Sequence, residues 1–318
     1  MISIVIPVYN VADYLQKCLD SLIVQCDKEV KLICVDDGSL DESGTILDEY
    51  QKKHPKLIEV IHKQNGGLSD ARNAGLEIVK SDYVLFFDSD DFASENLISE
   101  VKKCINTHHP DLIVFDYYQY FSKTDTKEVI QIGCRQDKVY QLSLQPSILT
   151  KVKNAAWNKV YRTSLFKDIR YPKGYLYEDL GTTYKLFLKA KRICFINQPL
   201  YNYLADRGGN ITTTVDRRLL QLKDMAKEMV EYYKSQRAFE EYREELKYLC
   251  VRNLSDGLRK LRFTSDKSLR KEVQESFFGY LKKTFPDYNQ CKYPLKQQKY
   301  DWLYLNQRFC GLYYKYVV

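Results

Sequence analysis

The sequence lacks the glycine motifs that most often bind phosphates. No G-x-G-x-x-G follows the first apolar segment, and no G-x-x-x-x-G-K-[ST] occurs anywhere in the 318 residues. The first motif marks dinucleotide-binding folds and the second marks P-loop proteins. If the chain binds a nucleotide, it must therefore hold the phosphates by other means.

The sequence also lacks paired cysteines and metal-binding histidines. The nine cysteines are scattered without a C-x-x-C pair, and the four histidines show no ligand spacing. An odd number of dispersed cysteines is typical of reduced thiols and not of a disulfide framework. We therefore expect free thiols, as in a cytoplasmic protein.

Long apolar runs are absent as well. The start, MISIVIPVYN, has no basic segment before its apolar residues and turns polar within ten residues. Such a run is too short for a membrane-spanning helix and does not resemble a signal peptide. With 44% hydrophobic and 29% charged residues, the composition is that of a soluble globular protein.

Charge is unevenly distributed along the chain. The formal net charge is +7, of which residues 215–318 carry +8 and residues 1–214 carry −1. This asymmetry predicts two parts with different partners. Apolar residues in 216–285 recur every three or four positions, which predicts helices.

Residues 1–117 alternate apolar, β-branched runs with amphipathic segments. The expected strands cover residues 2–8, 30–35, 57–61, 83–87 and 112–115. The expected helices cover residues 13–24, 43–50, 69–79 and 95–105. Apolar strands that alternate with helices are typical of a mostly parallel sheet with helices on both faces.

Four of the expected strands end in polar, acidic or glycine-rich residues. These ends are PVYN (7–10), DDGS (36–39), NGG (65–67) and DSDD (88–91). In an open parallel sheet, ligands bind in the crevice beyond the carboxyl ends of the strands. The same residue types also favour ordinary turns, but five aspartates at one edge favour a binding site.

Three of these aspartates, Asp88, Asp90 and Asp91, fall within four positions. Crowded carboxylates repel one another unless a positive charge neutralises them. Their hard oxygen atoms suit Mg²⁺ or Mn²⁺, which usually bind through one or two carboxylates together with substrate phosphates. We therefore expect a divalent cation here that binds together with a diphosphate.

Six segments of the chain form a linked set of motifs. They are SIVIPVYN (3–10), VDDGSLDES (35–43), NGGLSDARNAGL (65–76), DYVLFFDSDD (82–91), WNKVYRTSLF (157–166) and YLYEDLGTTYKLF (175–187). Together they resemble the family 2 glycosyltransferases with the GT-A fold. The resemblance covers about residues 1–215. It implies an α/β fold of the GT-A type, Rossmann-like and mostly parallel, with a C-terminal helical extension.

The resemblance also implies an organisation and an activity. Residues 1–117 would be the nucleotide-sugar-binding half and residues 118–215 the acceptor-side half of one domain, followed by a basic, Tyr-rich region over 216–318. The implied activity is the metal-dependent, inverting transfer of a hexose or N-acetylhexosamine. The donor would be a UDP-sugar, and the acceptor a glycan or a lipid-linked saccharide.

Individual residues receive roles from the same resemblance. The implied donor-binding residues are Pro7, Tyr9, Asp36, Asp37, Asn65, Gly66, Arg72, Asp88, Asp90 and Arg207. The implied ligands of Mn²⁺ or Mg²⁺ are Asp90 and Asp91. The implied catalytic residues are Asp179, as the general base, and Glu178. The implied acceptor-binding residues are Trp157 and Lys159.

Some of these roles have plain structural alternatives. Asp168 and Asp206 could also serve as the base, although they lack an equivalent motif. Asp179 could be an ordinary acid in the first turn of a helix, and Trp157 could be a core ring. In this family the segment 203–214 often closes over the diphosphate, whereas here it could equally be a linker.

Two other functions fit part of the pattern. A sugar nucleotidyltransferase uses a similar sheet, but it would need a glycine-rich, basic loop after the first strand, where the sequence has PVYNVADYL. A non-catalytic carbohydrate-binding protein on the same fold would be expected to have lost carboxylates, and all of those implied by the resemblance are present.

The C-terminal region interleaves basic residues with aromatic ones. The aromatic residues in 286–318 include Tyr293, Tyr300, Trp302, Tyr304, Tyr313, Tyr314 and Tyr316. Such a pattern suits an anionic membrane surface, a solvated face or a homodimer contact. No nucleic-acid-binding motif is present, so we expect no nucleic-acid partner. The expected location is cytoplasmic, with peripheral attachment at the inner face of the membrane.

Overall fold

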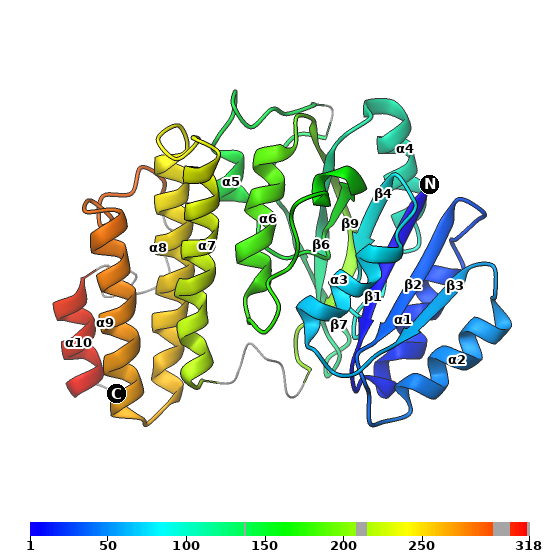
Figure 1. The fold of residues 1–318 in the computed structure, drawn as a ribbon, viewed down its shortest axis with the longest axis horizontal. Helices are drawn as coiled ribbons and strands as arrows, with labels where there is room; N and C mark the ends of the chain where they lie inside the picture. Colours follow the sequence, from blue (N-terminus) through cyan, green and yellow to red (C-terminus); the bar gives the residue numbers. More distant parts are fainter. Residues whose placement is uncertain (137, 208–214, 295–305, 317–318) are drawn as a thin grey trace. The chain divides into compact units, whose positions relative to one another are not determined.

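The computed structural model describes residues 1–136, 138–207, 215–294 and 306–316 (Figure 1). Its contacts divide the chain into two units. The first unit comprises Met1–Gln145, Asn154–Gly174 and Leu186–Arg207. The second comprises Pro146–Lys153, Tyr175–Lys185 and the described residues after Arg207. The domain boundary expected at 215/216 stays a prediction.

Regular elements account for most of both units. The strands are β1 (Ile2–Val8), β2 (Val30–Asp36), β3 (Ile58–His62), β4 (Tyr83–Phe86), β5 (Phe92–Ala93), β6 (Leu112–Phe121), β7 (Thr126–Ile130), β8 (Lys159–Arg162) and β9 (Ile193–Leu204). The helices are α1 (Ala12–Ile23), α2 (Ser43–Lys53), α3 (Leu68–Ile78), α4 (Leu97–His108), α5 (Ile148–Lys151), α6 (Glu178–Lys189), α7 (Gln221–Ser235), α8 (Arg243–Lys260), α9 (Lys267–Thr284) and α10 (Gln307–Tyr316).

The first unit is built on one sheet with the order β3-β2-β1-β4-β8-β6-β9-β5, with β7 paired to β6. The run β3-β2-β1-β4 is entirely parallel, and β6 is parallel to β9. The predicted α/β fold with a mostly parallel sheet is therefore confirmed. The sequence analysis did not predict β8, which lies between β4 and β6 and runs antiparallel to both.

Burial explains why these segments are strands. Every residue of β1 is buried, which matches a strand covered on both faces. Helix α3 packs on β1 and β2, and Gly75 permits this close approach. A Cβ atom at Gly75 would lie only 2.4 Å from Cγ1 of Val5. This packing places the amino end of α3 near the carboxyl ends of the strands.

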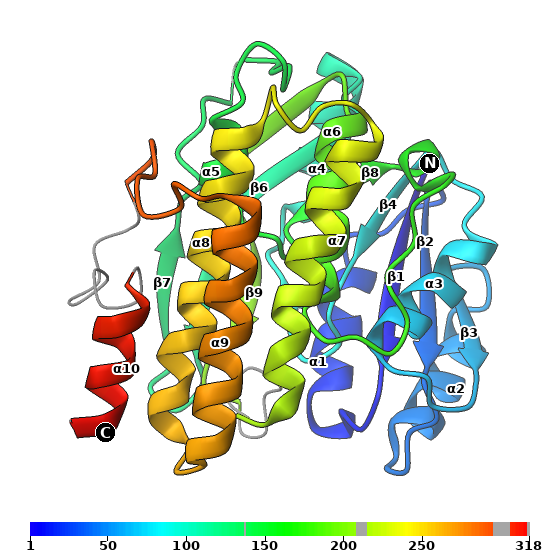
Figure 2. The same ribbon diagram turned by 60° about the vertical axis from the view of Figure 1, so that its left-hand side comes forward.

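The second unit is helical, as the apolar periodicity of residues 216–285 predicted. Helices α7, α8 and α9 lie side by side (Figures 1 and 2) and contact one another. Each helix contributes fully buried apolar side chains, among them Met229, Leu254 and Phe277. Among the described residues, no helix has the length and apolar character needed to cross a membrane.

Several sequence predictions lie outside the described residues. These are the segment 208–214, Tyr300, Trp302, Tyr304 and the side chain of Tyr316.

Candidate active site

Strand register brings the predicted donor residues to one edge of the first unit. Val8 at the end of β1 pairs with Asp36 at the end of β2, and Asp36 pairs with His62 of β3. On the other side of β1, Val5 pairs with Phe86 at the end of β4. Pro7 and Asp36 lie at the ends of β1 and β2, and the segments that follow the strands hold Tyr9, Asp37, Asn65, Gly66 and Asp88. They therefore share one edge, as the parallel sheet predicts.

Asp36 is a buried carboxylate held by short polar contacts. Its Oδ1 accepts a hydrogen bond from the Ser39 N–H at 2.9 Å, and its Oδ2 lies 2.9 Å from Nδ1 of His62. Burial raises the pKa of Asp36, but the hydrogen bonds from Ser39 and His62 outweigh it, so the pKa is lowered overall. Asp36 is therefore ionised at neutral pH.

Asp37 fixes the glycine loop that follows β3. Its Oδ1 accepts from Lys63 Nζ at 2.6 Å and from the Gly66 N–H at 3.0 Å. Its Oδ2 accepts from the Gly67 N–H at 2.7 Å. Only 3% of Asp37 is exposed. These contacts hold the loop against β2, beside the amino end of α3.

Two of the crowded acids after β4 are paired with arginines. We call residues 88–91 the acidic loop. Oδ1 of Asp88 lies 3.0 Å from Nη2 of Arg72, whose side chain is buried and lies over the Tyr171 ring. Asp90 forms an ion pair with Arg207 at the end of the first unit. The sequence analysis placed both arginines in the donor site but did not predict these pairs.

Asp91 is held by the end of β9. The Tyr201 hydroxyl donates to its Oδ2 at 2.5 Å, and the Leu204 N–H donates to its Oδ1 at 2.7 Å. Burial raises the pKa of Asp91 well above its usual range, and the charges of Asp90 and Asp88 add to the effect. Sequence reasoning missed Tyr201 and Leu204, although YNYL (201–204) closes a long apolar segment.

The acidic loop fits a divalent cation that is shared with a substrate. Among the described residues, no three or more His, Cys, Asp or Glu side chains are grouped to hold a metal. Mg²⁺ and Mn²⁺ need only one or two carboxylates when phosphate oxygens complete the site. Asp90 and Asp91 would supply hard oxygen ligands, and a cation would offset the charges of Asp90 and Asp88, which add to the effect of burial in raising the pKa of Asp91.

The two predicted acceptor residues of the first unit are both buried. Trp157 is 8% exposed and stacks on Tyr201 and Tyr203, with ring centroids 4.5 and 5.4 Å apart. Lys159 is fully buried, and its Nζ donates to the Ala155 carbonyl and to Oδ1 of Asn158, both at 2.6 Å. Both side chains pack inside the first unit, and their contact with an acceptor stays a prediction.

The predicted catalytic acids open α6 in the second unit. Glu178 is buried and Asp179 is half-buried in the first turn, where the helix dipole favours negative charge. The residue before them, Tyr177, has a φ of +60°. A bulky residue rarely adopts this left-handed conformation, which often marks a functional site.

The competing acids serve local structure in the first unit. Asp168 forms an ion pair with Lys189. Asp206 accepts hydrogen bonds from the N–H groups of Ser122 and Lys123, both at 2.9 Å. Neither arrangement involves another acid of the predicted site.

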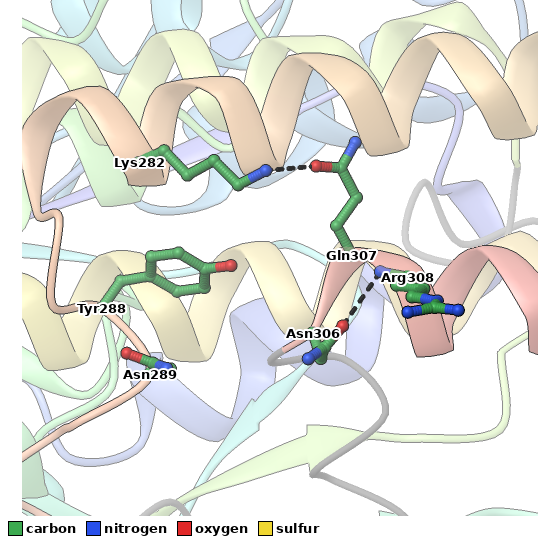
Figure 3. A pocket seen from close by; sticks show the side chains of 6 residues that line it. All are labelled: Lys282, Tyr288, Asn289, Asn306, Gln307 and Arg308. Carbon is green, nitrogen blue, oxygen red and sulfur yellow. Dashed lines mark hydrogen bonds between the residues drawn. The ribbon is translucent and has the colours of Figure 1, made fainter.

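The second unit also has a polar pocket between α9 and α10 (Figure 3). Its volume is about 380 Å³, and the residues lining it are Lys282, Tyr288, Asn289, Asn306, Gln307 and Arg308. Lys282 donates to Oε1 of Gln307 at 2.6 Å, which joins the two helices. No residue predicted to bind the donor, the metal or the acceptor lines this pocket.

Comparisons with known proteins agree with the geometry. A family model described as glycosyl transferase family 2 matches residues 3–170. Glycosyltransferase GlyA of Streptococcus pneumoniae is 32% identical over 238 residues, which is 72% of this chain and 34% of GlyA. The poly(ribitol-phosphate) β-N-acetylglucosaminyltransferase TarS of Staphylococcus aureus is 28% identical over 214 residues, 65% of this chain and 36% of TarS. The chain thus spans about a third of these two relatives.

Solved structures show the same fold. TarS residues 1–349 in complex with UDP-GlcNAc match with a TM-score of 0.61 at 21% identity, covering 92% of each chain. The mannosyltransferase PcManGT of Pyrobaculum calidifontis, in complex with GDP-Man and Mn²⁺, matches with a TM-score of 0.55 at 12% identity. It covers 99% of this chain and 87% of PcManGT. The predicted GT-A fold is confirmed.

Proposed function

The chain belongs to glycosyl transferase family 2, and we propose that it is an inverting enzyme that uses a UDP-sugar. It would move a hexose or N-acetylhexosamine to a glycan or lipid-linked saccharide. The observation that carries the proposal is the acidic loop, in which three carboxylates lie at the carboxyl end of β4 inside the matched region. TarS, a relative of similar fold, binds UDP-GlcNAc.

We propose that the first unit binds the donor. Pro7, Tyr9, Asp36, Asp37, Asn65 and Gly66 would contact the nucleoside, and Asp88 the ribose. Arg72 and Arg207 would contact the diphosphate, because guanidinium groups match phosphate oxygens. A diphosphate that attracts Arg207 away from Asp90 would leave that carboxylate available to a metal.

We propose that Asp90 and Asp91 hold Mn²⁺ or Mg²⁺ with the diphosphate. A divalent cation supplies positive charge to the departing UDP. PcManGT, which has a similar fold, was solved with Mn²⁺. In this chain the partners of Asp91 fix its carboxylate in a buried place, which is how a protein orients a metal ligand.

We propose that Asp179 acts as the general base, with Glu178 beside it. Asp179 would take the proton of the acceptor hydroxyl as its oxygen attacks the anomeric carbon. The bond from that carbon to UDP breaks, and UDP leaves with the bonding electron pair. Attack opposite to the leaving group inverts the configuration. A positioned base contributes about 10²- to 10⁴-fold to the rate.

We propose a saccharide acceptor near Trp157 and Lys159 and a contact between the basic C-terminal region and an anionic membrane surface. The name of TarS specifies a poly(ribitol-phosphate) acceptor for that protein. A cytoplasmic enzyme at the inner face of the membrane would meet lipid-linked saccharides there. A homodimer contact remains the other use of this region.

The test is incubation of the protein with a panel of UDP-sugars, Mn²⁺ and candidate saccharide acceptors. We expect one UDP-sugar to give released UDP, and the release to rise when the matching acceptor is added. In a parallel reaction supplied with a nucleoside triphosphate and a sugar phosphate, release of pyrophosphate would instead indicate a nucleotidyltransferase. Binding of saccharides without turnover of any donor would contradict catalysis.

A further inference from the structure

The Tyr201 side chain of β9 contacts the acidic loop at both of its ends. Its hydroxyl donates to Oδ2 of Asp91 at 2.5 Å and accepts from the Asp88 N–H at 3.3 Å. The residue is fully buried. One hydroxyl group therefore joins the first backbone amide of the loop to its last carboxylate.

The end of β9 also holds the second oxygen of Asp91. The Leu204 N–H donates to Oδ1 at 2.7 Å. This part of β9 is paired to β6, where Tyr118 faces Asn202 and Tyr120 faces Leu204. Both carboxylate oxygens are thus oriented by a paired strand, and each keeps a further lone pair for another partner.

Packing holds the Tyr201 ring independently of its hydroxyl. The ring stacks on Trp157 at 4.5 Å and 16°, and it lies 4.6 Å from the ring of Phe87. These contacts are between the rings, one stacked and one tilted at 47°. Removal of the hydroxyl alone should therefore leave the ring in place and release the carboxylate of Asp91.

We infer that Tyr201 is a positioning residue that orients Asp91 for a divalent cation. The inference rests on the metal role proposed above for Asp90 and Asp91. Partners behind a metal ligand fix its orientation, and their loss typically lowers metal affinity about 10- to 100-fold. Tyr201 acts through Asp91 and needs no contact of its own with the substrate.

Tyr203 provides a matched control on the same strand. It stacks on Trp157 as well, with centroids 5.4 Å apart at 9°. Its hydroxyl makes no hydrogen bond with any residue that the structure describes. Tyr201→Phe and Tyr203→Phe therefore delete the same atom from two rings in one stack, but only the first deletion removes a contact to Asp91.

The experiment is a Mn²⁺ titration of the thermal stabilisation that UDP gives to the full chain. In Tyr201→Phe, the Mn²⁺ concentration at half-effect should rise about 10- to 100-fold, and in Tyr203→Phe it should stay near the parent value. If Tyr201 acts through Asp91, adding Tyr201→Phe to Asp91→Asn should change the half-effect concentration little further.

A second variant tests the same role through the other contact of Asp91. Leu204→Pro lacks the backbone N–H that donates to Oδ1 of Asp91. It should also raise the Mn²⁺ concentration at half-effect. If the parent responds to Mn²⁺ but Tyr201→Phe and Tyr203→Phe need the same Mn²⁺ concentration for half-effect, the role of Tyr201 is overturned and the metal role of Asp90 and Asp91 is not. If the stabilisation of the parent by UDP does not depend on Mn²⁺, the metal role is overturned as well.

Discussion

Asp91 in the first unit and Asp287 in the second have pKa values shifted in opposite directions. Burial, together with the charges of Asp90 and Asp88, raises the pKa of Asp91. Hydrogen bonds from Arg243 and then Lys247 lower the pKa of Asp287. The first carboxylate lies in a local excess of negative charge, and the second lies among cations.

This difference distinguishes the candidate site around Asp91 from the structural ion pairs around Asp287. Lys247 is 1% exposed and lies 2.7 Å from Asp287, so the pair ties α8 to the segment after α9. In the acidic loop, negative charge is concentrated beyond the carboxyl end of β4, the edge of a parallel sheet where ligands bind. Carboxylates perturbed as Asp91 is, by burial and neighbouring negative charge, are candidates for function. The two units therefore use buried charge in different ways.

The largest effect should come from Asp179, the acid of the second unit to which we give a chemical role. Asp179→Asn should lower transfer about 10²- to 10⁴-fold and leave UDP-sugar affinity nearly unchanged. Steady-state kinetics with thermal-shift binding would measure both. Asp168→Asn, which removes an exposed acid, should stay within about twofold of the parent. Poor donor binding with normal turnover at saturation would move Asp179 to the donor site.

The next largest effect should come from Asp→Asn substitutions in the two units, which should differ in their effect on UDP binding. Asp91→Asn should weaken UDP binding in Mn²⁺ by about 100-fold, because loss of a ligand should cost at least as much as loss of its supporting partner. It should not lower thermal stability in the absence of ligand. Asp287→Asn should leave UDP binding unchanged. Equal UDP affinities for all three proteins would remove the acidic loop from the donor site.

A smaller effect is expected for membrane binding by the second unit. Lys282→Gln/Lys283→Gln should lower binding to vesicles with anionic lipid by about 30-fold at low salt, since each lysine near such a surface contributes about 1 kcal/mol. Added salt should shrink the difference. The matched pair Lys52→Gln/Lys53→Gln in the first unit should bind like the parent. If the parent does not bind acidic vesicles, the basic C-terminal region has a structural or dimer-forming role instead.

The smallest effect concerns the stability that Asp287 provides. Its folded-state pKa is lowered below the unfolded value of about 3.9. Its contribution is therefore present above that value and is lost as the pH falls through the folded-state pKa. Asp287→Asn should lower the free energy of unfolding by about 1 kcal/mol at pH near 7, allowing for its exposure. Urea unfolding should show that the difference shrinks in acid, and a difference that grew there would contradict the assignment.

Sequence patterns predicted the part of the fold that depends on neighbouring residues along the chain. The four strands, their parallel arrangement and the position of the acidic loop follow from apolar segments with polar ends, whereas the order β3-β2-β1-β4 came from the structure. The insertion of β8 could not be predicted in this way. It is a four-residue strand, and its place depends on pairing with β4 and β6 across long sequence separations.

The partners of the acidic loop were not predictable for the same reason. Tyr201 lies 110 residues from Asp91, and Arg207 lies 117 residues from Asp90. No spacing rule joins such residues, because the contact arises only when β9 enters the sheet beside β6. The roles that the resemblance gave to the donor, metal, acceptor and base residues stay predictions until variants are measured.

The most direct test of the metal-dependent donor site is UDP binding with and without a chelator. The melting temperature of the parent should rise with UDP in the presence of Mn²⁺, because a ligand that binds only the folded state stabilises it. Excess EDTA should abolish this rise. Undiminished stabilisation by UDP in excess EDTA would contradict the proposal that Asp90 and Asp91 bind the donor through a divalent cation.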